Sequence, residues 1–161
     1  MKKEWDEENY TEKFQFVYQY GESLLSLVTA RPGSFVVDLG CGNGALTQKL
    51  AEKYEVLGID ASPDMLAKAK ELHPNIDFMR ADACDFSLER KADAIFSNAV
   101  FHWIENQDKL VENIAANLKN GGELVFEFGG KGCADTVHKA LFQAFDKYGY
   151  EYRLDFNFRS I

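Results

Sequence analysis

The chain has 161 residues, of which 46% are hydrophobic, and its formal net charge is −8. This length and apolar content predict one domain spanning residues 1–161, with a hydrophobic core and no internal repeat or low-complexity segment. The acidic balance, without a cluster of Lys and Arg, argues against nucleic acid as a partner, because phosphate binding needs positive charge.

The amino-terminal residues are charged where a signal peptide has an apolar core, and no later stretch is long enough to span a bilayer. These features predict a soluble, cytoplasmic protein with no membrane partner. The three cysteines, Cys41, Cys84 and Cys133, are widely separated and form no C-x-x-C pair. They are expected to be reduced thiols, and no metal site is predicted.

Apolar residues at helical spacing predict an amphipathic helix over residues 14–28, ahead of a Pro-Gly-Ser turn. We therefore expect an amino-terminal helical cap at residues 1–33, followed by a core at 34–150. Residues 151–161 then begin a further segment.

The sequence from Phe35 to Thr47 predicts a buried strand, a glycine loop and the first turn of a helix. Gly40, Gly42 and Gly44 lack Cβ, so the chain can turn sharply and a ligand can approach the backbone and the N–H groups of the helix. The spacing also satisfies the dinucleotide pattern G-x-G-x-x-G/A, so NAD or FAD stays open on this pattern alone.

A helix over 45–53 and a second buried strand over 55–59 follow, and Asp60 stands at the tip of that strand. About 20 residues beyond the loop, this carboxylate is placed to accept hydrogen bonds from both ribose hydroxyls of a nucleoside. The alternative is a helix N-terminal charge, because Ser62 is a plausible N-cap of the next helix and Pro63 suits its first position.

The remaining elements continue the alternation of strand and helix. We expect a helix ending near His73, strands over 76–80 and 93–99, a helix over 108–119 stopped by Asn-Gly-Gly, a strand over 123–128 and a helix over 135–148. This pattern predicts an α/β fold with a doubly wound, Rossmann-like parallel sheet in the order 3-2-1-4-5, with helices on both faces. Strand five would be an apolar edge, which invites pairing in a homodimer.

The run Val-Asp-Leu-Gly-Cys-Gly-Asn-Gly resembles motif I of the class I S-adenosylmethionine-dependent methyltransferases. The resemblance implies S-adenosylmethionine as the cofactor and S-adenosylhomocysteine as the product. It implies that Asp38 reaches the methionine end, that Gly40 and Gly42 pack against the cofactor, and that Asp60 with Ala61 holds the ribose.

Later positions extend the resemblance. Asp82 and Ala83, after the third strand, are similar to the family's adenine site, although an Asp in such a loop alone is usually a turn residue. Asn98 and Ala99, at the end of the fourth strand, correspond to the segment that lines the methionine and the methyl group.

The pattern Ser-Asn-Ala-x-x-x-Trp resembles the branch that includes trans-aconitate and malonyl-carrier-protein methyltransferases, which esterify carboxylates. The implied function is O-methylation of a carboxylate or hydroxyl of a small acceptor. His102 replaces the usual Gln of that branch. It is the candidate to orient the acceptor or take its proton, and packing is the alternative.

The family's sheet usually continues through further strands, whereas this chain stops at Ile161. We therefore expect a carboxy-terminal truncation that lacks the last family strands. Two alternative functions stay open from the sequence: a nicotinamide-dependent oxidoreductase, and a cofactor-binding module without turnover.

Overall fold

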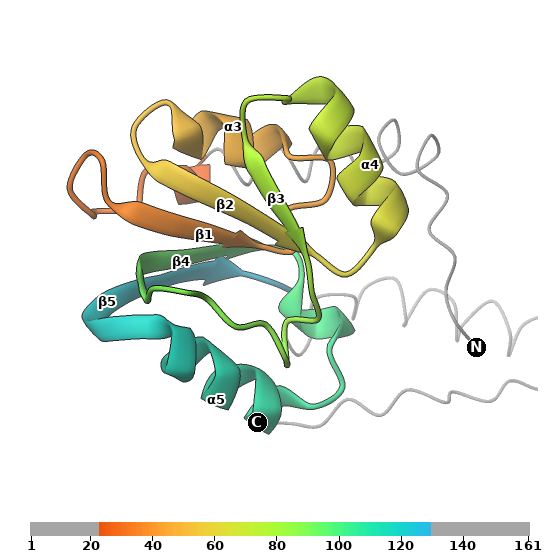
Figure 1. Ribbon diagram of the computed structural model, residues 1–161. Helices are drawn as coiled ribbons and strands as arrows, with labels where there is room; N and C mark the ends of the chain where they lie inside the picture. The colour runs from red at the N-terminus through yellow and green to blue at the C-terminus, as the bar shows by residue number, and fades with distance from the viewer. Residues whose placement is uncertain (1–22, 130–161) are drawn as a thin grey trace, which may run out of the picture. The chain divides into compact units, whose positions relative to one another are not determined.

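Five parallel strands form one sheet in the computed structural model, which describes residues 23–129. The strand order is β3-β2-β1-β4-β5, so the predicted topology is confirmed (Figure 1). The strands are β1 Phe35–Leu39, β2 Glu55–Asp60, β3 Asp77–Arg80, β4 Ala92–Asn98 and β5 Leu118–Glu127. The predicted helix over 135–148, the segment 151–161 and Cys133 lie outside the described residues, as does the cap before residue 23.

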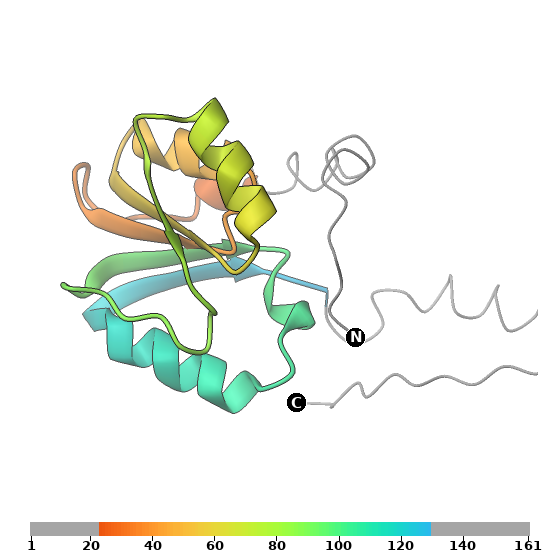
Figure 2. The same ribbon diagram turned by 45° about the vertical axis from the view of Figure 1, so that its right-hand side comes forward.

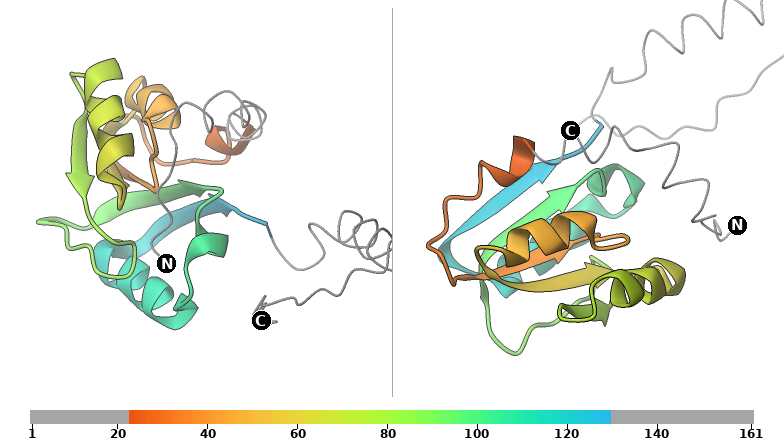
Figure 3. Two further views of the ribbon diagram at one scale, coloured as in Figure 1. Left: turned by 90° about the vertical axis from the view of Figure 1, so that its right-hand side faces the viewer. Right: turned by 90° about the horizontal axis from the view of Figure 1, so that it is seen from above.

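Helices cover both faces of the sheet, as predicted. α3, Ala45–Ala51, and α4, Pro63–Leu72, lie on one face, and α5, Gln107–Asn117, lies on the other (Figures 1 and 3). A short 3-10 helix, η1, Phe101–Trp103, joins β4 to α5. All described elements belong to one compact unit.

The hydrophobic core has two parts, one on each face of the sheet. Val37 of β1 packs on the α5 side, with Leu110 and Ile114 of that helix. Val36 packs on the other side, with Leu46 and Leu50 of α3. Because β1 is buried on both faces, its sequence is a nearly continuous apolar run, which is why the strand could be recognised.

The predicted amino-terminal helix ends earlier than expected. Residues 23–25 are helical, but residues 26 and 27 form a turn, so the prediction of a helix through Val28 is wrong at its end. The Tyr54 hydroxyl donates to the carbonyl oxygen of Val28 at 3.0 Å, and the backbone N–H of Thr29 donates to the Glu123 carboxylate at 2.9 Å. The N–H groups of Leu27 and Val28 donate three residues back, to the carbonyl oxygens of Leu24 and Leu25 at 3.0 and 3.2 Å, so the chain tightens into a turn before these contacts.

No helix forms in the described connection between β3 and β4, and none was predicted between residues 80 and 93. The connection instead runs beside α5 (Figure 2). Buried Asn117 of α5 accepts from the Leu88 N–H at 2.9 Å and donates to the Phe86 carbonyl at 3.1 Å. One amide side chain therefore supplies hydrogen-bond partners to two backbone groups of a connection that has no regular backbone hydrogen bonding of its own.

The boundary between α5 and β5 also differs from the prediction. The helix ends at Asn117 instead of Lys119, and β5 begins at Leu118, five residues before the predicted start. Leu118 pairs with Ala92, and Lys119 Nζ lies 2.7 Å from a carboxylate oxygen of Asp93. Gly121 of the predicted Asn-Gly-Gly stop is left-handed, with φ +75°, but it lies inside the strand, within the register shift between Leu118 and Glu123.

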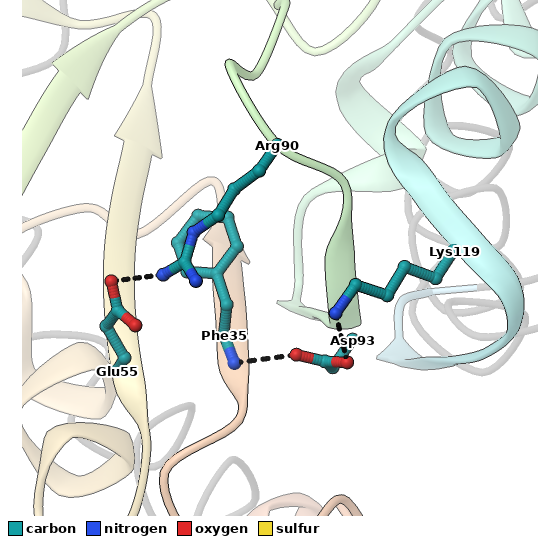
Figure 4. Close-up of polar contacts among 5 residues, drawn as sticks. All are labelled: Phe35, Glu55, Arg90, Asp93 and Lys119. Carbon is teal, nitrogen blue, oxygen red and sulfur yellow. Dashed lines mark hydrogen bonds and ion pairs between the residues drawn. The ribbon is translucent and has the colours of Figure 1, made fainter.

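The amino-terminal ends of the strands, which form the amino edge of the sheet, are joined by paired charges (Figure 4). Asp93 accepts from the backbone N–H of Phe35 at 2.9 Å and from Lys119. Arg90 pairs with Glu55, and its guanidinium lies 4.3 Å from the centre of the Phe35 ring. These contacts link the starts of β2, β1, β4 and β5.

Candidate functional site

The candidate site lies at the opposite, carboxyl edge, where β1, β2 and β4 end side by side. Asp38 is paired in register with Gly58 on one side and with Phe96 on the other. The glycine loop follows β1 directly, Asp60 ends β2 and Asn98 ends β4. The topology thus brings together groups that are as much as 60 residues apart in the sequence, from positions 38 to 98.

The glycine loop turns back at once onto β2. The backbone N–H groups of Gly40 and Cys41 both donate to the Ile59 carbonyl oxygen, at 2.7 and 3.0 Å. Gly40, Gly42 and Gly44 have φ of +81°, +55° and +82°. L-residues with a side chain rarely adopt this region, so all three glycines are required for the turn.

The three glycines differ in what surrounds them. A Cβ added at Gly40 would overlap the methyl groups of Val100, and one at Gly44 would approach Phe78 at 2.9 Å. At Gly42, by contrast, nothing lies within 4 Å of an added Cβ. Gly40 and Gly44 are therefore packing positions, whereas Gly42 leaves open space where a ligand can approach the backbone.

Asp60 holds the loop from the tip of β2. One carboxylate oxygen accepts from the Gly42 N–H at 2.9 Å, and the other accepts from the Ser62 N–H at 2.8 Å. Ser62 in turn caps α4, because its hydroxyl accepts from the Met65 N–H at 3.3 Å, and Pro63 follows at the first helical position. Asp60 thus does contact the start of α4, through the Ser62 N–H, as the helix-terminus interpretation predicts. Each carboxylate oxygen keeps a further lone pair for a ligand.

Asp38 is almost fully buried, with 2% of its surface exposed, and the Thr47 hydroxyl of α3 donates to it at 2.6 Å. Burial raises the pKa of Asp38 to about 7, the negative charge of Asp60 adds to this, and the Thr47 hydrogen bond opposes it. The carboxylate therefore ties β1 to α3 behind the glycine loop.

Asp82 follows β3 in an exposed turn. Its side chain accepts from the Cys84 N–H at 2.8 Å, and its carbonyl oxygen accepts from the Asp85 N–H at 2.9 Å. This is the Asx-type turn that the residue alone predicts. Ala83 is half-buried beside it.

Ala99, directly after β4, has φ +59°, the one positive φ of a non-glycine residue in the part of the chain described. Its N–H donates to the Glu127 carbonyl oxygen at 2.7 Å, which fixes the end of β4 against β5. A left-handed alanine costs about 1–2 kcal/mol. Asn98, the neighbouring site candidate, is half-buried.

His102 lies in η1 and is exposed, with its ring centre 4.7 Å from that of Trp103. Partial burial lowers the pKa of His102, which favours the neutral imidazole. Gln107 steadies the turn, because its amide donates to the carbonyl oxygens of Phe101 and Ile104 at 2.7 Å each. The imidazole is therefore on an ordered turn beside the ends of β4 and β5.

Sequence reasoning missed two residues of this site, Thr47 and Val100. A polar β-branched residue at position 47, between the apolar Leu46 and Leu50 of α3, was an available signal, because a buried hydroxyl needs a partner. Val100 gave no signal, since its partner Gly40 is 60 residues earlier in the sequence.

Within residues 23–129, no group of three or more His, Cys, Asp or Glu side chains is arranged to hold a metal ion. None of the helices in the same range has the length and apolar character needed to cross a membrane.

Comparisons with known proteins match this geometry. The methyltransferase domain family matches residues 36–122. Trans-aconitate 2-methyltransferase of Methylobacterium nodulans is 34% identical over 127 residues, covering 77% of this chain and 49% of that protein. Malonyl-[acyl-carrier protein] O-methyltransferase 1 of Ilyobacter polytropus is 36% identical over 103 residues, covering 60% of this chain and 38% of that protein.

Among solved structures, an S-adenosylmethionine-dependent methyltransferase of Mesorhizobium loti is 31% identical, with a TM-score of 0.62 over 68% of this chain and 53% of that one. The chain spans about half the length of the trans-aconitate methyltransferase it matches. The match to the methyltransferase domain family extends from β1 into β5 and so includes the glycine loop and Asp60. The chain therefore belongs to the S-adenosylmethionine-dependent methyltransferase family.

Proposed function

We propose that this protein binds S-adenosylmethionine at the carboxyl edge of the sheet and transfers its methyl group to a carboxylate oxygen of a small acceptor. The names of the two relatives, which describe methylation of trans-aconitate and of a malonyl carrier protein, support an acid acceptor. The cofactor would supply a methyl group bonded to a positively charged sulfur. The leaving group would be the neutral thioether, S-adenosylhomocysteine, whose departure needs no metal. The protein then has to bind and orient the two reactants.

The observation that carries the proposal is the open space at Gly42 beside Asp60. The Gly42 backbone can be approached closely, and its N–H is held by the Asp60 carboxylate at 2.9 Å. A nucleoside on this loop would bring its ribose hydroxyls to the spare lone pairs of Asp60, with Ala61 next to it. Gly40 would support the loop from behind, through its contact with Val100.

The other candidates complete the site as follows. Asp38 would place negative charge near the cationic methionine end. Asp82 and Ala83 would face the adenine, and Asn98 with Ala99 would border the methionine and the methyl group. Asp38 and Asn98 lie at the ends of β1 and β4, and Asp82, Ala83 and Ala99 lie in the turns that follow β3 and β4, all at the same edge of the sheet.

His102 would serve the acceptor. Its lowered pKa favours a neutral imidazole, which can donate or accept a hydrogen bond. A carboxylate acceptor needs no general base, so orientation is the expected role; a hydroxyl acceptor would need His102 as the base.

Isothermal titration calorimetry with S-adenosylhomocysteine and with NAD⁺ tests the cofactor. We expect binding of the first and none of the second; the reverse would restore the nicotinamide interpretation. Methyl transfer to a panel that contains trans-aconitate and matched alcohols and amines then tests the acceptor. Binding without transfer to any member would favour the cofactor-binding module.

We further propose a homodimer through the edge of β5. Within the described residues β5 pairs with β4 alone, and Leu124 and Phe126 are 37% and 44% exposed. Sedimentation equilibrium tests this: Phe126→Lys should weaken a dimer, whereas Val111→Lys on the exposed side of α5 should not. A wild-type monomer at all concentrations would contradict it.

A cytoplasmic location is also proposed, in keeping with the free thiols of Cys41 and Cys84.

A further inference from the structure

Val100 occupies the space that a side chain on Gly40 would need. Both of its γ-methyl groups, and its Cβ at 3.0 Å, lie against the position of an added Cβ. Val100 comes directly after Ala99, whose left-handed conformation is held by the hydrogen bond to β5. The turn after β4 is therefore packed against the glycine loop after β1, by a contact that closes only if residue 40 has no side chain.

The same residue begins the turn that carries His102 and Trp103. The carbonyl oxygen of Val100 accepts from the Trp103 N–H at 2.9 Å. Phe101 is buried, and its ring centre lies 5.3 Å from that of Phe126 in β5. With Phe101 anchored on β5 and Val100 against Gly40, the turn has two fixed points. The two exposed residues, His102 and Trp103, come directly after these fixed points.

We infer that Val100 is a positioning residue: it joins the cofactor loop at Gly40 to the turn that bears His102 and Trp103, and so sets the acceptor side relative to the cofactor. This inference rests on the proposed function for the meaning of the two sides. The contact between Val100 and Gly40 does not depend on the proposed function, so the inference and the proposed function can fail separately. Val100 need not touch cofactor or acceptor to act in this way.

A double-mutant cycle tests the inference in a Trp5→Phe background, where Trp103 is the remaining tryptophan. Gly40→Ala should shift the Trp103 emission maximum and weaken S-adenosylhomocysteine binding about tenfold, because the added methyl displaces the turn or the loop. Adding Val100→Ala should return the emission and recover part of the affinity, because the clash is removed while the strain of the positive φ at residue 40 remains. Val100→Ala alone should leave the dissociation constant within about threefold.

Gly44→Ala is the matched control. It has nearly the same φ, +82° against +81°, and it also meets neighbouring side chains, but these are His73 and Phe78. Its loss of affinity should persist when Val100→Ala is added, because the sites share no contact. Equal rescue of both glycine variants, or none for Gly40→Ala, would overturn the inference.

If Gly40→Ala does not fold, folding of the double variant is itself the rescue. If neither folds, Val100→Ala decides: a changed Trp103 emission with retained affinity supports the inference, and unchanged emission overturns it. If the wild type does not bind S-adenosylhomocysteine, the proposed function fails. The Trp103 emission measured through the cycle still decides whether Val100 positions the turn.

Discussion

The two edges of the sheet use aspartate in opposite ways. At the amino edge, Asp93 pairs with Lys119 and with the Phe35 N–H, and neighbouring Arg90 pairs with Glu55 (Figure 4). At the carboxyl edge, Asp60 accepts from two backbone N–H groups. The carboxyl edge thus keeps uncompensated negative charge next to open space, whereas the amino edge neutralises its charges.

This difference separates stability from function. The amino-edge pairs fix the starts of four strands and leave little for a ligand to recognise. At the carboxyl edge, Asp38 is buried, which raises its pKa, and the negative charge of nearby Asp60 raises that pKa further. Perturbed carboxylates in such a setting are typical of binding sites, because burial there is tolerated for a purpose other than stability.

Asp38→Asn should stabilise the protein at neutral and alkaline pH. Because burial raises the pKa of Asp38 from 3.8 to about 7, the folded state holds a proton that the unfolded chain releases between these values. That stabilisation is full below about pH 4 and is lost as the pH rises through about 7. At pH 8 the variant should gain up to about 4 kcal/mol, from 1.36 kcal/mol per pKa unit.

Urea unfolding at several pH values measures this effect. The free energy of unfolding of the wild type should fall between about pH 4 and 7, and that of Asp38→Asn should be flatter there. The amide keeps an oxygen for the Thr47 hydroxyl, so packing is preserved. Parallel curves for the two proteins would contradict the buried, proton-binding carboxylate.

Asp60→Ala should weaken S-adenosylhomocysteine binding by at least about 100-fold, because the proposed ribose contacts and the hold on the Gly42 N–H are lost together, each worth about 1.5–3 kcal/mol. Calorimetry gives the dissociation constant. The matched control is Asp77→Ala, an exposed aspartate at the amino end of β3, which should leave binding unchanged. A similar loss in both variants would point to net charge instead of the site.

Asp93→Ala should lower the free energy of unfolding by about 1–2 kcal/mol, since one backbone hydrogen bond and one partly exposed ion pair are lost. Denaturant unfolding measures it. Binding of S-adenosylhomocysteine should be unchanged, because the residue lies at the other edge of the sheet. An affinity loss of tenfold would mean that the two edges are coupled.

Arg90→Met should have the smallest effect, under about 1 kcal/mol, because its pair with Glu55 is exposed and salt screens such pairs. The Met side chain can keep contact with the Phe35 ring that the guanidinium now covers. Unfolding at low and high salt checks this. A large, salt-sensitive loss would show that the ion pair stabilises the edge more than exposed pairs generally do.

Local patterns were enough to predict much of this fold. Apolar runs fix β1, β2 and β4, and the Ser-Pro pair fixes the start of α4, because these signals depend on neighbours in sequence. The α5–β5 boundary was missed because Lys119 finds its partner in Asp93, and the contact of Asn117 with the β3–β4 connection was not foreseen. Both are contacts between residues far apart in the chain.

The sequence by itself determined the strand order, the glycine loop and the place of Asp60 at the tip of β2. Each follows from hydrophobic pattern, glycine spacing and the handedness of parallel connections. Only the tertiary structure decided that Gly42, unlike Gly40, faces open space, and that Asp38 is buried against Thr47. Burial and open space depend on which distant side chains meet, such as Val100 on Gly40, and no local pattern carries that information.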